Sequence, residues 1–152
     1  MIVFRVGVGA VIINSQGKIM AFQRADNHGA WQLPQGGLNE GEEYIEGMFR
    51  EVYEETGIKK ENLQLLGEYP EWLAYELPKD IWERKRFRGQ VHKWYLLKFT
   101  GDERKINLKK AKDNEFKAWK WMTFAELAEE TLPFKKRIFQ RLAEGFSEYL
   151  TD

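Results

Sequence analysis

The chain has 152 residues, of which 43% are hydrophobic and 32% charged, and its 24 basic and 24 acidic side chains cancel formally. This balance argues against binding of nucleic acid through a generally basic surface, and the length leaves no room for two domains, so we expect residues 1–152 to form one domain. The absence of cysteine excludes disulfides and thiolate metal sites, and no apolar run is long enough to predict a membrane helix. We expect a cytoplasmic protein.

The chain is expected to begin with a β-hairpin. Residues 4–13 are rich in β-branched side chains and punctuated by glycine, and residues 18–24 form a second apolar stretch after a turn. Residues 25–30 predict a polar loop, in which we expect His28 to be exposed to solvent and to take no part in catalysis. Residues 31–37, WQLPQGG, indicate a short strand followed by a loop.

Residues 36–58, GGLNEGEEYIEGMFREVYEETGI, join a glycine-rich turn to an acidic helix. On such a helix Ile45, Met48, Phe49 and Val52 follow the i, i+3, i+4, i+7 pattern of a single apolar stripe. We expect the helix to bury this stripe against the rest of the protein.

Another face of the same helix carries Glu51, Glu54 and Glu55. Like charges at these separations destabilise an isolated helix by roughly 0.2–0.5 kcal/mol per pair, and no lysine is interleaved to offset them. Arg50 is expected to reach Glu54 or Glu46, one turn away. A divalent cation would also offset the repulsion, since magnesium is held by a few carboxylates while it keeps water and phosphate oxygens as ligands. A solvated helix face without a ligand is the alternative.

The charges are unevenly distributed along the chain. Residues 40–61 contain eight acids and three bases, whereas residues 79–112 contain twelve bases and four acids. This distribution is expected if an acidic metal site faces a basic segment, so that the metal and the cationic side chains together neutralise a polyphosphate. Chance clustering of surface lysines is the alternative.

The second half of the chain predicts further strands and two closing helices. We expect strands at residues 63–69, 71–75, 91–100 and 115–121, a charged and partly helical excursion at 79–88, a lysine-rich loop at 101–113, a helix at 123–130 that starts with a Thr123–Glu126 capping box, and an amphipathic helix at 134–150. The tryptophans are expected in the core or on the faces of the sheet; they are Trp31, Trp72, Trp82, Trp94, Trp119 and Trp121.

The spacing in residues 36–58 resembles the Nudix box: glycine, five residues, glutamate, seven residues, Arg-Glu, an aliphatic residue, any residue, Glu-Glu, any residue, glycine and an aliphatic residue. Every defined position is filled, by Gly36, Glu42, Arg50, Glu51, Val52, Glu54, Glu55, Gly57 and Ile58. The resemblance implies a Nudix-type α/β/α sandwich with a mixed central β-sheet. It also implies Mg2+ or Mn2+ on the box helix and hydrolysis of a phosphoanhydride.

Four further stretches narrow the resemblance: WQLPQGG, WLAYELP at residues 72–78, GQVHKWYLLKF at 89–99 and the late PFK. They are similar to bacterial RNA 5′-pyrophosphohydrolases and to the related dinucleoside polyphosphate hydrolases. The implied substrate is 5′-triphosphorylated RNA, with dinucleoside polyphosphates or free nucleoside triphosphates as the alternatives. A non-catalytic nucleotide sensor with this fold would have degenerate box glutamates, and here none is degenerate.

The resemblance also implies roles for individual residues. The metals would be held by Glu51, Glu54, Glu55 and the backbone carbonyl of Gly36, with help from Glu115 on the loop before the last strand. One of these glutamates would act as general base, and which one stays open. Arg50 would belong to the same catalytic set.

The substrate-binding residues implied by the resemblance are mostly cationic or aromatic. The second member of the basic pair after the second strand is Ala25 here, so either the distal phosphate is held less strongly or another cation such as Lys93 substitutes. Phe134 would stack on the base, although a core position is the alternative for an aromatic at a helix start. The full set is Arg5, Arg24, Tyr75, Lys93, Phe134, Lys135 and Lys136.

Overall fold

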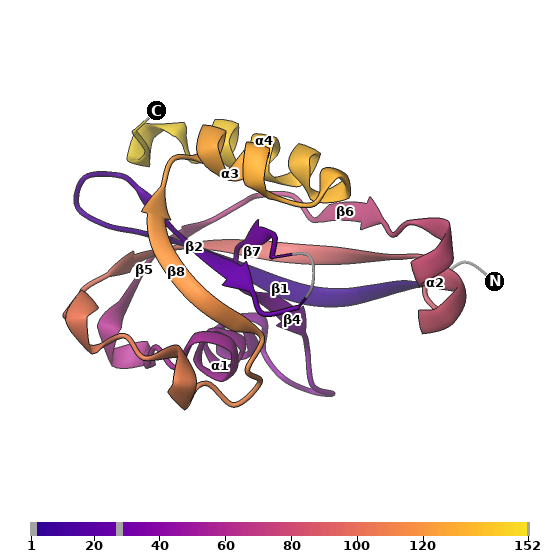
Figure 1. Ribbon diagram of the computed structural model, residues 1–152, viewed down its shortest axis with the longest axis horizontal. Helices are drawn as coiled ribbons and strands as arrows, with labels where there is room; N and C mark the ends of the chain where they lie inside the picture. The colour runs from indigo at the N-terminus through magenta and orange to yellow at the C-terminus, as the bar shows by residue number, and fades with distance from the viewer. Residues whose placement is uncertain (1–2, 27–28, 152) are drawn as a thin grey trace.

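The computed structural model describes residues 3–26 and 29–151 and confirms the expected α/β sandwich. A mixed sheet of eight strands lies between two layers of helices (Figure 1). His28 lies outside the described residues. Among the residues described, no helix is both long enough and apolar enough to cross a membrane.

The centre of the sheet is a parallel pair of long strands, β1 (Phe4–Ile13) and β7 (Gly89–Phe99). The order through the sheet is β3-β2-β1-β7-β5, with β4 paired to β1, β6 to β7 and β8 to β2, all antiparallel. The remaining strands are β2 (Ile19–Arg24), β3 (Trp31–Gln32), β4 (Gln35–Gly37), β5 (Leu63–Glu68), β6 (Leu73–Glu76) and β8 (Phe116–Met122).

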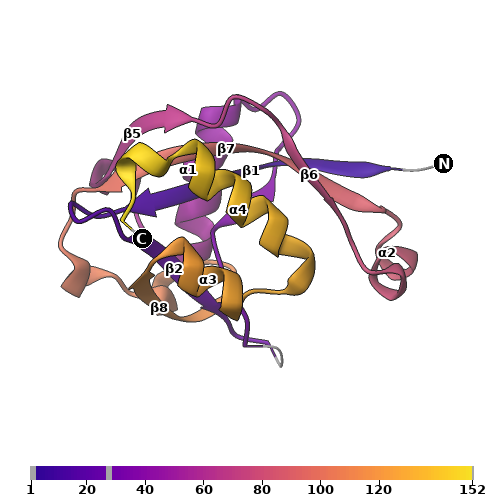
Figure 2. The same cartoon turned by 90° about the horizontal axis from the view of Figure 1, so that it is seen from above.

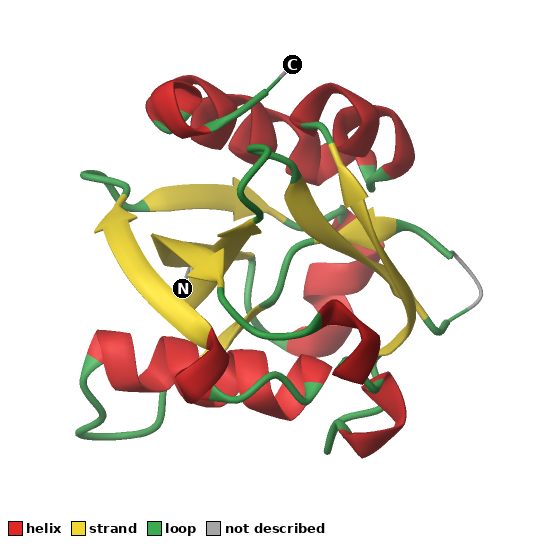
Figure 3. Cartoon of the chain, turned by 90° about the vertical axis from the view of Figure 1, so that its left-hand side faces the viewer, coloured by secondary structure: helices red, strands yellow, loops and turns green. Residues whose placement is uncertain are grey.

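Each face of the sheet buries its own apolar cluster. Helix α1 (Tyr44–Thr56) covers one face, and α3 (Phe124–Glu130) and α4 (Lys136–Gly145) cover the other (Figures 1 and 3). Trp94, fully buried on the α4 side, lies against Gly9 so closely that a Cβ there would meet the indole ring at 2.5 Å. The two central strands are therefore closely packed at this point.

The buried face of α1 differs from the predicted stripe. Met48 and Val52 are buried as expected, but Ile45 is 41% exposed and Phe49 only half-buried. The row that packs on the sheet is Met48, Val52 and Thr56, spaced by four residues, so a side chain three positions before Met48 lies at its edge. The prediction for Ile45 was wrong because an amphipathic pattern fixes the direction of a helix face only to within about one residue.

The C-terminal region is broken into shorter pieces than residues 134–150 predicted. The capping box of α3 is confirmed, with the Thr123 hydroxyl accepting from the Glu126 N–H. Helix α4 ends at Gly145, which packs so closely on Tyr69 that a Cβ would clash with the ring, and the next residue, Phe146, is buried. Short 3-10 helices form at Pro133–Lys135 and Ser147–Tyr149 in this region. Elsewhere in the chain, 3-10 helices form at Lys60–Asn62, Glu103–Lys105 and Leu108–Lys110.

The tryptophans divide between the core and the surface. Only Trp94 among them is fully buried, and Trp72 is 39% exposed, with its ring edge-on to Tyr44 at 5.3 Å. Trp82 packs instead beneath the guanidinium of Arg88. Trp72 therefore departs from the expectation of a core or sheet-face position, because it lies in the connection between β5 and β6.

Helix α2 (Lys79–Lys85) stands away from both helical layers, at the end of the sheet where β1 begins (Figure 2). Backbone hydrogen bonds tie the segment that follows it to the sheet, since Arg88 N–H donates to the Val3 carbonyl at 2.7 Å and Leu77 N–H to the Arg88 carbonyl at 2.9 Å. The charged excursion predicted at 79–88 is thus a fixed part of the fold.

Candidate active site

Arg50 organises the carboxylates of α1. Its guanidinium donates to Glu42 at 2.7 and 2.9 Å, to Glu51 at 2.9 Å, to Glu54 at 3.0 Å and to the Gly37 carbonyl at 2.8 Å. The expected contact with Glu54 is confirmed, whereas the principal partner is Glu42 rather than Glu46. The hydrogen bonds from Arg50, and then that from the Asn39 N–H, lower the pKa of Glu42 to about 2. One fixed cation therefore joins the loop before α1 to the acidic face of the helix.

A third carboxylate joins Glu51 and Glu54 from a distant part of the chain. Oxygen atoms of Glu51, Glu54 and Asp113 all lie within 4.8 Å of one another, a grouping that can hold a metal ion. The Asp113 N–H donates to the Glu54 carbonyl at 3.1 Å, and Asn114 follows in the left-handed conformation, with φ of 49°. Asp113 was not predicted from the sequence, in which its position two residues before Glu115 is the only signal.

Glu55 lies deeper, at 1% exposure, and its carboxylate accepts a hydrogen bond from the Gln35 N–H at 2.9 Å. Burial, the facing carboxyl group of Glu115 and the charge of Glu51 raise the pKa of Glu55 well above its usual range. No basic side chain among the residues described forms an ion pair with Glu55. A buried carboxyl group with acids beside it, and with no ion-pair partner in the described part of the chain, fits a site that is completed by a metal ion.

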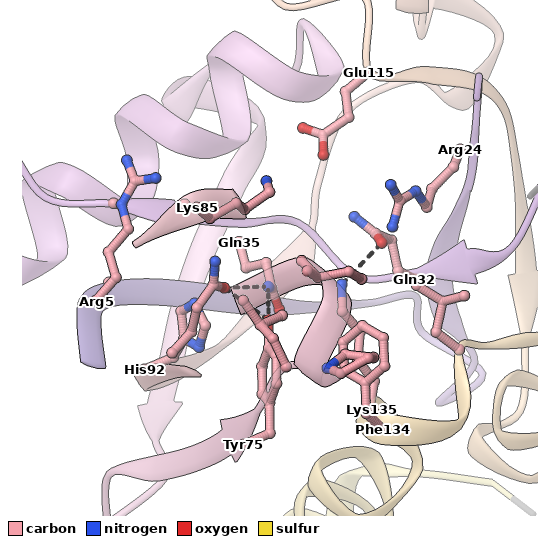
Figure 4. Close-up of a pocket in the computed structure, with 18 of the residues that line it drawn as sticks. Arg5, Arg24, Gln32, Gln35, Tyr75, Lys85, His92, Glu115, Phe134 and Lys135 are labelled. Atoms are coloured by element: carbon pink, nitrogen blue, oxygen red, sulfur yellow. Dashed lines mark hydrogen bonds between the residues drawn. The ribbon is translucent and has the colours of Figure 1, made fainter. Parts of the chain in front are cut away.

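Acidic side chains line one part of a cleft of about 790 Å³, which Figure 4 shows with Glu115 labelled; the acids are Glu51, Glu55, Asp113 and Glu115. Strands β1, β4, β6 and β7 contribute to the lining of the cleft, β1 and β7 with their first residues. Helices α1 and α2, the loop before β8 and the turn before α4 complete it. Its volume is that of a small-molecule site, and charged groups of both signs line it. Among the predicted residues the cleft gathers Arg5, Arg24, Gly36, Glu51, Glu55, Tyr75, Glu115, Phe134 and Lys135.

The glycine pair Gly36–Gly37 is where acidic and basic groups meet. A Cβ on Gly36 would overlap the carboxylate of Glu51, and a Cβ on Gly37 would lie 2.9 Å from the guanidinium of Arg5. A Cβ at either position would force the Glu51 carboxylate or the Arg5 guanidinium to move. This strand therefore brings Arg5 close to the carboxylates of α1, with only backbone between them.

The floor of the cleft is a hydrogen-bonded set of neutral side chains. Gln35 Nε2 donates to the Tyr75 hydroxyl at 2.8 Å, and this hydroxyl donates to Gln90 Oε1 at 2.7 Å. Burial raises the pKa of Tyr75 to about 12. His92 stacks against Tyr75 with ring centroids 5.9 Å apart, and burial lowers its pKa to about 3, so it stays neutral. None of the glutamine or histidine positions was singled out from the sequence.

Phe134 and Lys135 enter the cleft from the turn before α4. Phe134 is half-buried and packs on Tyr75 with centroids 5.5 Å apart, so it both contacts the core cluster and lines the cleft. The Lys135 ammonium is buried and donates to Gln32 Oε1 at 3.0 Å. Burial, and then the charge of Arg24, lower the pKa of Lys135 to about 8.

Two predicted substrate-binding lysines lie outside the cleft. The Lys93 ammonium donates to the Tyr69 carbonyl at 2.9 Å and pairs with Glu68 at 3.2 Å. Because β7 places successive side chains on opposite faces and His92 faces the cleft, Lys93 faces away from it. Lys136 is exposed at the start of α4 and does not line the cleft.

Comparison with known proteins matches the model of the NUDIX domain to residues 3–142. The chain belongs to the Nudix family. This Nudix protein is 38% identical to an RNA pyrophosphohydrolase of Roseobacter denitrificans over 97% of its length and 94% of the relative's. It is 39% identical to an RNA pyrophosphohydrolase of Azorhizobium caulinodans over 98% and 95% of the two chains.

Solved structures support the Nudix fold. A dihydroneopterin triphosphate pyrophosphohydrolase of E. coli superposes with a TM-score of 0.71 at 24% identity, covering 95% of this chain and 97% of the other. A C. elegans Ap4A hydrolase in a binary complex gives 0.70 at 19% identity, covering 95% and 98%. At these identities the likeness concerns the fold alone.

The raised pKa of Glu55 predicts a pH-dependent stability of the metal-free protein. Below the unfolded-state pKa, near 4.5, Glu55 is protonated whether the chain is folded or not, and its burial carries no charge penalty. As pH rises through the folded-state pKa the penalty appears and stability is lost. We expect Glu55→Gln to raise the free energy of unfolding at pH 8 by about 1–3 kcal/mol, measured by urea denaturation with a chelator.

The matched control is Glu129→Gln on α3, an exposed acid, which should change stability little at either pH. The advantage of Glu55→Gln should shrink at pH 4. A Glu55→Gln variant that is no more stable than the unmodified protein at pH 8 would contradict a buried, unpaired carboxylate.

Proposed function

We propose that this Nudix protein is a metal-dependent RNA 5′-pyrophosphohydrolase, which removes pyrophosphate from 5′-triphosphorylated RNA and leaves a 5′-monophosphate. The observation that carries the proposal is the cleft itself, in which a carboxylate group on α1 faces Arg5, Arg24 and Lys135. The RNA pyrophosphohydrolases to which the chain is similar over nearly its whole length support the choice of RNA.

The acidic wall fits Mg2+ or Mn2+, which take oxygen ligands. The residues that would hold the ions are Glu51, Glu54, Glu55 and Glu115, with the carbonyl of Gly36 as a further ligand and Asp113 beside them. When bound, such ions supply a more acidic water and neutralise charge on the phosphate oxygens.

The protein's own contribution is binding and orientation. Arg5, Arg24 and Lys135 would bind the phosphates by charge-assisted hydrogen bonds, and Phe134 would stack on a base. Arg50 donates hydrogen bonds to Glu42, Glu51 and Glu54 and is therefore a positioning residue for these acids. One of the cluster's carboxylates would take the proton of the attacking water.

The substrate is tested by comparing 5′-triphosphorylated RNA with diadenosine tetraphosphate under the same metal conditions. We expect kcat/KM to be higher for the RNA, with 5′-monophosphorylated RNA and either pyrophosphate or two orthophosphates as products. Free nucleoside triphosphate serves as a third substrate. Much faster turnover of the dinucleotide would replace the proposed function with that of a dinucleoside polyphosphate hydrolase.

Glu54→Gln tests the role of the α1 carboxylates. The substitution keeps the shape of the side chain and removes the charge, so we expect kcat to fall by roughly 100-fold or more while the fold is retained. Glu46→Gln, an exposed acid two turns earlier on the same helix, is the control and should leave kcat unchanged. Retained activity in Glu54→Gln would exclude Glu54 as a metal ligand.

A further inference from the structure

Lys85 is a cation of the cleft that no motif of the sequence marks. It is the last residue of α2 and lines the cleft together with Arg5. Figure 4 draws it between Arg5 and Gln35, with its ammonium directed into the pocket. Over residues 3–26 and 29–151, no side chain or carbonyl hydrogen-bonds or pairs with this ammonium, so its three N–H donors are available to a ligand.

The position of Lys85 is set by the way α2 ends. Arg86 adopts the left-handed conformation, with φ of 64°, and its N–H donates to the Trp82 carbonyl at 3.1 Å. Beyond it, the ring of Phe87 lies beneath the Arg5 guanidinium at 5.9 Å, and the Arg88 guanidinium lies over Trp82 at 5.7 Å. The end of α2 is therefore held against Arg5, and the two cations share one side of the cleft.

The two sides of the cleft differ in what they can bind. Phe134 and Lys135 lie on the side away from Arg5 and Lys85 (Figure 4). Arg5 itself lies against Gly37, next to the carboxylates of α1. A nucleotide with its base at Phe134 and its inner phosphates at the carboxylates would extend its outer phosphates towards Arg5 and Lys85.

We propose that Lys85 binds the terminal phosphate of the substrate's 5′-triphosphate. The proposal rests on the function proposed above and names the residue that recognises the length of the phosphate chain. Lys93, expected from the sequence to supply this charge, is engaged by Glu68 and the Tyr69 carbonyl. Arg84 also lines the cleft, but its Nε donates to the Asp80 carbonyl of its own helix at 3.3 Å. Of Lys85, Lys93 and Arg84, Lys85 is the best placed to bind a phosphate, because it lines the cleft and its ammonium has no partner among the described residues.

The test compares one RNA sequence carrying either a 5′-triphosphate or a 5′-diphosphate. Lys85→Gln should lower kcat/KM for the triphosphate about tenfold, as expected for a lost charge-assisted hydrogen bond. The diphosphate, which is one phosphate shorter, should lose less than about twofold. Lys85→Arg keeps the charge and should restore most of the triphosphate activity. Lys79→Gln, on the same helix but outside the cleft lining, is the matched control.

Any outcome other than a selective loss on the triphosphate would contradict the proposal, and the pattern of losses shows why. Equal losses on the two RNAs would mean that Lys85 contacts the RNA body or only supports the fold, and unchanged activity on both would mean that it contacts neither. An unmodified enzyme that cleaves neither RNA contradicts the proposed function itself. A Lys85→Gln effect that Lys79→Gln reproduces would show a general electrostatic attraction by α2.

Discussion

The site depends on one unfavourable arrangement, the crowding of carboxylates around the Gly36–Gly37 strand. Arg50 offsets part of the repulsion by engaging Glu42, Glu51 and Glu54 at once. Arg50 forms no ion pair with Glu55. Glu55 is buried and has no ion-pair partner in the described part of the chain, and burial together with Glu115 and Glu51 raises its pKa, so ionising it carries a penalty that a bound cation would offset.

The surrounding structure holds this charge at the edge of a cleft. Glycine at positions 36 and 37 lets the backbone pass between the acids and Arg5, where a Cβ would displace the Glu51 carboxylate or the Arg5 guanidinium. The cations on the opposite walls come from β1, β2, α2 and the turn before α4. A polyphosphate bound there would bridge the two sets of charges, with metal ions on one side and guanidinium or ammonium groups on the other.

The sequence predicted the site residues that lie close together along the chain better than those that folding brings together. Glu51, Glu54 and Glu55 share one helix, so their spacing alone placed them together, and the resemblance to the RNA pyrophosphohydrolase branch of the family placed Glu115 with them. Asp113 and Lys85 could not be assigned in this way, because their positions depend on how a loop and a short helix fold back onto the sheet. Lys93 shows the complementary error: the strand was predicted correctly, but which of its alternating faces meets the cleft is decided by pairing with β1.

The central claim is that the acidic face of α1 binds divalent ions. Calorimetric titration of the metal-free protein with Mg2+ or Mn2+, in the presence of a nonhydrolysable nucleoside polyphosphate, tests it most directly. The arrangement of Glu51, Glu55 and their neighbours predicts saturable uptake at millimolar or lower concentrations. No uptake under these conditions would contradict the account of the site.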